Sequence, residues 1–72
     1  MVEIFTIADR INSRKLVSLF DALYTGKYTR GITYSSYAND VILDFHFGAH
    51  GQEDANIFLT LASESGIKFK EF

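Results

Sequence analysis

Along the segment from Tyr28 to Phe47, residues expected to face the core alternate with residues expected to face away from it, with a break at Asn39-Asp40. Period-two alternation on both sides of a two-residue break predicts a β-hairpin, and Asn and Asp both tolerate the backbone of a tight turn. All the paired residues would then share one buried face, so the turn and the alternation agree. The pairs on that face would be Ala38 with Val41, Ser36 with Leu43, Tyr34 with Phe45, and Ile32 with Phe47.

A helix is predicted before this hairpin, over residues 14–25. Asn12 or Ser13 would cap its first turn, and residues 9–13 would form the turn before it. Gly26 is placed for a left-handed C-cap. The apolar stripe at helical spacing comprises Leu16, Leu19, Phe20 and Leu23.

A second helix is predicted after the hairpin, over residues 52–65. Glu53 and Asp54 stand in its first turn, where the helix dipole favours acidic side chains, and Gly66 would close it. Its buried stripe comprises Ala55, Phe58, Leu59 and Ala62.

Two further strands complete the chain. Residues 2–8 are apolar at nearly every position, as in a strand in the middle of a sheet, and residues 67–72 form the last strand. The order β-α-β-β-α-β predicts an α+β fold, the split βαβ or ferredoxin-like two-layer sandwich. Four antiparallel strands would carry two helices on one face, and residues 1–72 would form a single domain.

Composition narrows the possible functions. The chain has no Cys, so it has no disulfide and no thiolate metal site, and its aromatic content of 15% predicts a core built from large rings. It shows no signal peptide and no bilayer-spanning stretch, so we expect a cytoplasmic protein that does not bind membranes. The net charge of −2 disfavours a general nucleic-acid binder. Basic residues prevail over residues 10–36, however: Arg10, Arg14, Lys15, Lys27 and Arg30.

The second face of the predicted sheet would be open and is a candidate binding surface. Asp44 lies where RNA-recognition domains carry a stacking aromatic, and its charge would repel phosphate. Because of this charge, nucleic-acid binding or regulatory ligand binding through this face is the alternative hypothesis and not the main one. The residues expected on the open face are Thr33, Ser35, Tyr37, Ile42, Asp44 and His46, joined by Lys68 and Lys70.

Catalytic and metal chemistry receive little support from the motifs. Asp44, His46 and His50 could be ligands of a divalent ion, but the two histidines lie across a strand end and two glycines rather than on one helical turn. Arg10, Asn12 and Arg14 fall where small ferredoxin-like hydrolases have a phosphate-binding loop, but without its glycine-rich cradle. No catalytic residue, cofactor or metal is predicted.

Protein binding is the function that remains. Ile57 and Leu61 lie off the main stripe of the second helix, and a small domain often buries both faces of its sheet against another chain. We expect a non-catalytic inhibitor or regulator of a partner protein, of the kind encoded by phages against host proteins, that also forms a homodimer. The candidate contact residues are Tyr37, Ile42, Asp44, His46, Ile57, Leu61, Lys68 and Lys70.

Overall fold

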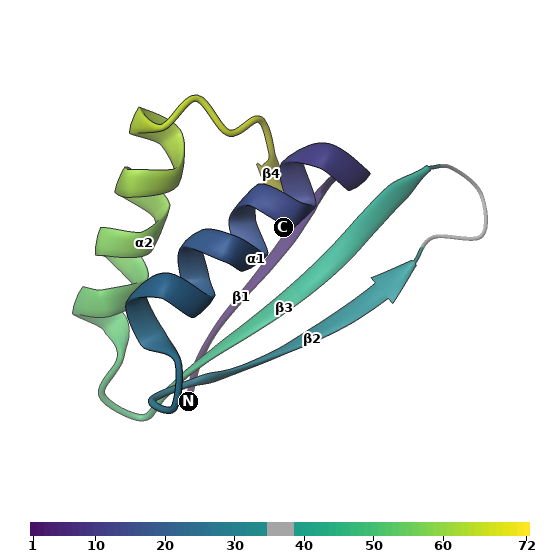
Figure 1. The fold of residues 1–72 in the computed structure, drawn as a ribbon. Helices are drawn as coiled ribbons and strands as arrows, with labels where there is room; N and C mark the ends of the chain where they lie inside the picture. Colours follow the sequence, from purple (N-terminus) through teal and green to yellow (C-terminus); the bar gives the residue numbers. More distant parts are fainter. Residues whose placement is uncertain (35–38) are drawn as a thin grey trace.

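Six elements follow in the predicted order in the computed structural model, which describes residues 1–34 and 39–72 (Figure 1). The four strands form one antiparallel sheet in the order β2-β3-β1-β4, and both helices cover the same face of it. The predicted ferredoxin-like α/β sandwich is therefore confirmed. The elements are β1 (Val2–Asp9), α1 (Arg10–Tyr24), β2 (Thr29–Tyr34), β3 (Asp40–Gly48), α2 (Gln52–Glu64) and β4 (Lys70–Glu71).

The central position predicted for the first strand is correct, because β1 pairs with β3 on one side and β4 on the other. Its side chains alternate between the two faces of the sheet. Ile4, Thr6 and Ala8 are buried under the helices, whereas Phe5 and Ile7 lie on the open face.

The hairpin is present, but its predicted register is wrong. Ile32 pairs with Leu43 instead of Phe47, and Tyr34 pairs with Val41 instead of Phe45. Asp40 belongs to β3 and pairs with Asp9 of β1, so it is not part of a two-residue turn. The other two predicted pairs include Ser36 and Ala38, which lie outside the described residues.

The error in register leaves the predicted faces unchanged. Each partner is displaced by four residues, and any even displacement keeps a side chain on the same face of a strand. Alternation alone therefore cannot distinguish these registers. The buried face of β3 is the predicted one and comprises Val41, Leu43, Phe45 and Phe47.

The first helix begins at Arg10 rather than Arg14, because Asp9 is its N-cap. The Asp9 carboxylate accepts a hydrogen bond of 2.7 Å from the Asn12 backbone N–H, so residues 9–13 do not form a separate turn. The buried stripe also differs from the prediction. Tyr24 is buried, and Leu23 remains 42% exposed.

The core is aromatic, as the composition predicts. The Phe20 ring centroid lies 4.8 Å from that of Phe45, 5.6 Å from that of Phe47 and 5.7 Å from that of Phe58. The second helix ends one residue earlier than predicted, while Ala55, Phe58 and Ala62 are fully buried as expected.

The last strand is shorter than predicted. β4 contains only Lys70 and Glu71, which pair with Ile7 and Thr6 of β1. The backbone N–H of Phe72 also donates to the Phe5 carbonyl at 3.0 Å. No helix in the described part of the chain is long and apolar enough to cross a membrane.

Candidate functional site: the groove between α1 and β2

Helix α1 and strand β2 are tied together at one end of their contact. Arg30 of β2 donates two hydrogen bonds to Asp21 of α1, from Nε to Oδ1 at 3.0 Å and from Nη2 to Oδ2 at 2.9 Å. The paired guanidinium lowers the pKa of the Asp21 carboxyl. This bidentate pair fixes the distance between the helix and the strand at that position.

Interactions with the second helix reinforce this end. The Tyr28 hydroxyl donates to Asp54 Oδ2 at 2.7 Å, and Lys27 Nζ donates to the same oxygen at 3.1 Å. Those two donors lower the pKa of the Asp54 carboxyl. The Tyr24 hydroxyl donates to the Asp54 carbonyl at 2.9 Å. We call this region the tied end, defined by Asp21, Tyr24, Lys27, Tyr28, Arg30, Phe47 and Asp54.

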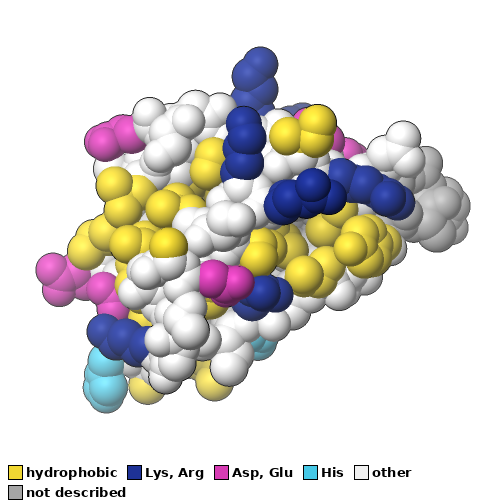
Figure 2. Space-filling model, in the orientation of Figure 1, with side chains coloured by type: hydrophobic (Ala, Val, Ile, Leu, Met, Phe, Trp, Pro, Cys, Tyr) yellow, Lys and Arg dark blue, Asp and Glu magenta, His cyan; other side chains and the backbone are white. Residues whose placement is uncertain are grey.

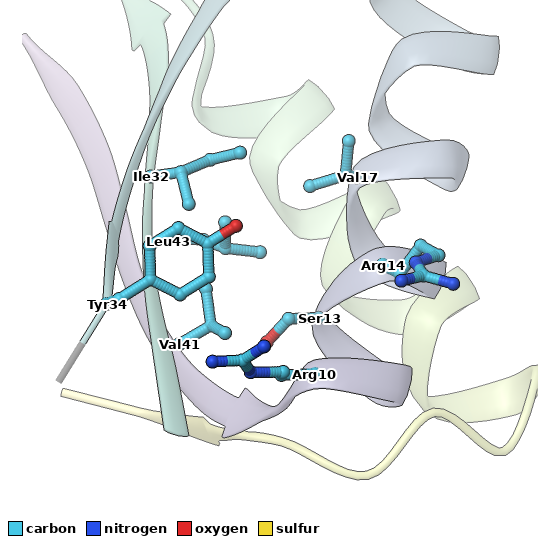
Figure 3. Close-up of a pocket in the computed structure, with 8 residues that line it drawn as sticks. All are labelled: Arg10, Ser13, Arg14, Val17, Ile32, Tyr34, Val41 and Leu43. Atoms are coloured by element: carbon cyan, nitrogen blue, oxygen red, sulfur yellow. The ribbon is translucent and has the colours of Figure 1, made fainter. Parts of the chain in front are cut away.

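At the other end, α1 and β2 separate and leave a groove of about 250 Å³ (Figure 3). Ile32 and Tyr34 of β2 point toward α1, and side chains of α1 and β3 complete the walls. The volume is below the range of about 300–1,000 Å³ usual for small-molecule pockets, so it suits one or two side chains. The lining residues are Arg10, Ser13, Arg14, Val17, Ile32, Tyr34, Val41 and Leu43.

The groove contains apolar surface that the fold leaves uncovered. Ile32 is 44% exposed and Tyr34 is 65% exposed, although both lie on the face of the sheet that carries the helices. Val17 is partly buried against the core, and Leu43 is fully buried beneath. A partner side chain placed here would cover this apolar surface.

Positive charge gathers at the rim of the groove. The Arg10 guanidinium carbon lies 5.6 Å from the centroid of the Tyr34 ring, a cation–π contact, and Arg14 follows one helical turn later. Figure 2 shows Lys and Arg side chains beside a hydrophobic area over α1 and β2. Within the described residues, Lys27 and Arg30 form ion pairs with carboxylates, whereas Arg10 and Arg14 form none.

Strand β2 forms one side of the groove and is also an edge of the sheet. It pairs with β3, and no strand in the described part of the chain pairs with its other side. An edge strand presents backbone N–H and C=O groups that can pair with another chain. The groove and the free edge are therefore next to each other on one strand.

The predicted open face exists, and several of its expected residues lie on it. Asp44 is paired in the sheet with Phe5, Ile42 with Ile7, and Lys70 with Ile7 from the other side. The Phe5 and Phe72 ring centroids lie 6.1 Å apart and add an aromatic pair to this face. Ser35 and Tyr37, also predicted here, lie outside the described residues.

Asp44 and His46 are brought together with Glu3 of β1, which the sequence analysis did not identify. His46 Nε2 lies 3.0 Å from Asp44 Oδ2, and His46 Nδ1 lies 3.8 Å from Glu3 Oε1. His50 is not a member of this group. Each of the three side chains offers one ligand atom, and these atoms lie within 4.8 Å of one another, so the group has the donors for a divalent cation; His46 forms an ion pair with the carboxylates only when its ring is protonated.

Arg10, Asn12 and Arg14 do not lie in a loop after the first strand, contrary to the expectation, because they belong to the first turns of α1. Asn12 has a structural role there. Its Nδ2 donates to the Asp9 carboxylate, and its Oδ1 accepts a 3.0 Å hydrogen bond from the Lys68 backbone N–H. The amide thus joins the start of α1 to the segment before β4.

The remaining candidate residues are separate from the groove. Lys68 precedes β4 and is not part of a strand, contrary to the prediction, whereas Lys70 is in β4. On α2, Ile57 is 43% exposed and Leu61 is partly buried. The sequence did contain one indication of the groove, the i, i+4 spacing of Arg10 and Arg14, but the predicted helix began too late to include it.

The fold and the groove define a ferredoxin-like α/β sandwich with an apolar, positively rimmed groove beside a free sheet edge. No protein-family model, no curated protein and no solved structure matches this chain.

Proposed function

We propose that this protein is a non-catalytic protein-binding module that acts as an inhibitor or regulator by holding a segment of a partner protein at the α1–β2 groove. The observation that carries the proposal is the apolar groove beside the free edge of β2. Peptide-binding domains commonly combine an exposed sheet edge, which supplies backbone hydrogen bonds, with a pocket for alternate side chains.

The chemistry of the groove supports binding rather than catalysis. Among the lining residues that the structure describes, the one aliphatic hydroxyl is that of Ser13, which is buried and donates to the Ala8 carbonyl at 3.2 Å. The other polar groups are the two guanidinium groups and the Tyr34 phenol, which lack an adjacent general base among the lining residues. These groups can position an anion or a peptide.

The groove fits a protein partner better than the open face does. The centre of the open face holds polar side chains, since His46 Nε2 lies 3.0 Å from Asp44 Oδ2 and Glu3 adds a further acid. Its apolar contribution comes from Phe5, together with Ile7, Ile42 and Phe72. Self-association through this face stays a prediction. Light scattering checks it, with a dimer mass that falls to the monomer mass in Phe5→Ser.

A tagged pull-down from lysate of the source cells, treated with nuclease, tests the proposed function. Two matched variants would be compared with the wild type: Ile32→Ser, in the groove, and Ile42→Ser, on the opposite face of the neighbouring strand. Thermal melts would first show that both variants are folded. We expect one protein retained by the wild type and by Ile42→Ser but not by Ile32→Ser.

Two results would contradict the proposal. Loss of the partner only in Ile42→Ser would move the binding surface to the open face. Retained material that disappears with nuclease would instead favour the nucleic-acid hypothesis, which also predicts affinity that falls steeply with salt.

A further inference from the structure

We infer that the partner segment adds to the sheet as a strand along β2, with an apolar side chain in the groove and a carboxylate side chain, two residues away, held by Arg10 and Arg14. This inference rests on the proposed function and specifies the chemistry of the partner. The occupant is an extended protein segment containing Asp or Glu.

The spacing follows from the two β2 residues that line the groove. Ile32 and Tyr34 are separated by one residue, so both point toward α1. On an added strand, the residues opposite them would also be two apart and would also face α1. The residue opposite Ile32 would meet an apolar surface, because Ile32 itself and Val17 of α1 line that part of the groove.

The positive charge of the groove rim favours an acidic side chain at the second position of the partner segment. The residue opposite Tyr34 would lie beside the Arg10 guanidinium, which is 5.6 Å from the Tyr34 ring centroid. Arg14 lines the same groove from the next turn of α1 (Figure 3). A carboxylate there can accept charge-assisted hydrogen bonds from guanidinium groups, whereas a cationic side chain would be repelled.

The tied end restricts where the segment can lie. Arg30 and Asp21 bridge β2 and α1 on the side of Ile32 away from Tyr34, so the apolar pocket ends there. The carboxylate site is consequently on the Tyr34 side, whichever way the added strand runs. The recognised pattern is an apolar residue and an acidic residue separated by one position.

A single heptapeptide probe covers both strand directions. In the sequence Thr-Glu-Thr-Val-Thr-Glu-Thr, acetylated, amidated and labelled with fluorescein, a glutamate stands two residues from the valine on each side. Fluorescence anisotropy would measure its affinity for the wild-type protein in low salt. The control peptide carries glutamine in place of both glutamates.

A thermodynamic cycle tests the acid recognition. We expect the glutamine peptide to bind the wild type about tenfold more weakly than the glutamate peptide. On the Arg10→Gln/Arg14→Gln double variant, the two peptides should bind equally, because the coupling is between carboxylate and guanidinium. Lys15→Gln, an exposed basic residue of the same helix that does not line the groove, should change affinity less than about twofold.

Backbone N-methylation tests the strand addition. Every second N–H group of an added strand points toward β2, and the N–H groups between them point away. Methylating the amides that point toward β2 should abolish binding, whereas methylating the other set should not. Equal tolerance of both sets would overturn strand addition. Equal binding of the two peptides by the wild type, or no saturable binding at about 1 mM, would overturn acid recognition.

These outcomes are distinguishable from failure of the proposed function. If Ile32→Ser abolishes capture of the partner in the pull-down but the peptide cycle shows no coupling, the groove binds protein without recognising an acid. If Ile32→Ser changes neither capture nor peptide binding, the proposed function itself fails.

Discussion

The two ends of the contact between α1 and β2 differ in how the same two elements meet. At the tied end, the Tyr28 and Phe47 ring centroids lie 5.2 Å apart, those of Tyr24 and Phe47 lie 5.7 Å apart, and a bidentate ion pair joins Arg30 to Asp21. At the groove, Ile32 and Tyr34 are exposed on the helix-covered face.

The tied end contributes to the stability of this small domain, whereas the groove has surface available for binding. Large buried rings and satisfied polar groups at the tied end contribute to the folded state. The groove leaves apolar and cationic groups without equivalent partners in the described part of the chain. Substitutions at the two ends should therefore separate stability from binding.

The largest expected effect is that of Phe47→Ala at the tied end. Phe47 is fully buried and its ring contacts those of Tyr24, Tyr28 and Phe58, so truncation should lower the free energy of unfolding by about 3–5 kcal/mol. A domain of this size has about that much stability, so we expect the variant to be unfolded. Circular dichroism measures this. A melting temperature equal to that of the wild type would show that the assigned core is wrong.

Gly51→Ala should have the next largest effect. Gly51 packs against the backbone of Phe47, and a Cβ added there would lie 1.9 Å from the Phe47 carbonyl oxygen. The main chain must shift to relieve this clash, which should lower the free energy of unfolding by about 1–3 kcal/mol or more. Urea denaturation checks the change. Gly31→Ala is the control, because its nearest contact would be an ordinary 3.9 Å.

Acid should weaken the tied end. The pKa of Asp54 is lowered by hydrogen bonds from Tyr28 and Lys27, and that of Asp21 by the Arg30 pair. A carboxyl whose folded-state pKa lies below the ordinary value of 3.8 adds stability above that pH and loses it as the pH falls through the folded-state pKa.

Melting temperatures between neutral pH and about pH 2 would measure the loss. Asp54→Asn should be less stable than the wild type at neutral pH and should lose less stability in acid. Glu53→Gln, an exposed acid of the same turn, is the matched control. Identical acid profiles for Asp54→Asn and the wild type would show that this network does not contribute.

Arg14→Gln should have the smallest effect on stability. Arg14 is exposed at the groove rim and forms no described ion pair, so the free energy of unfolding should change by less than about 0.5 kcal/mol. If chemical denaturation shows a loss of 1 kcal/mol or more (about fivefold in the folding equilibrium), Arg14 belongs to the folded framework and the comparison between the two ends is weakened.

The hairpin shows how much of the fold the sequence predicted. Alternation identified the buried face of β3 from Val41 to Phe47, and the structure confirms it. Alternation could not identify Leu43 as the partner of Ile32, because every even displacement satisfies the same pattern. The register depends on β3 pairing along its length with β1, including Asp40 with Asp9.

The candidate site was predicted less well than the fold. Ile42, Asp44 and His46 were correctly assigned to one sheet face, but Glu3, which lies beside His46, precedes it by 43 residues in the chain. The groove was missed because it requires Arg10 to be helical and Tyr34 to be on an edge strand. Neither condition can be predicted from the local spacing of apolar and polar residues.

The spacing of apolar residues was enough to predict the order of the elements and the buried faces of β3 and α2, because periods of 2 and 3.6 residues specify which side of a strand or helix is apolar. The aromatic core followed from the composition. The position of β2 at the sheet edge and the contact of Arg10 with Tyr34 were established by the three-dimensional structure alone. These features depend on which distant segments pair, and such long-range pairing is set by the packing of the whole chain.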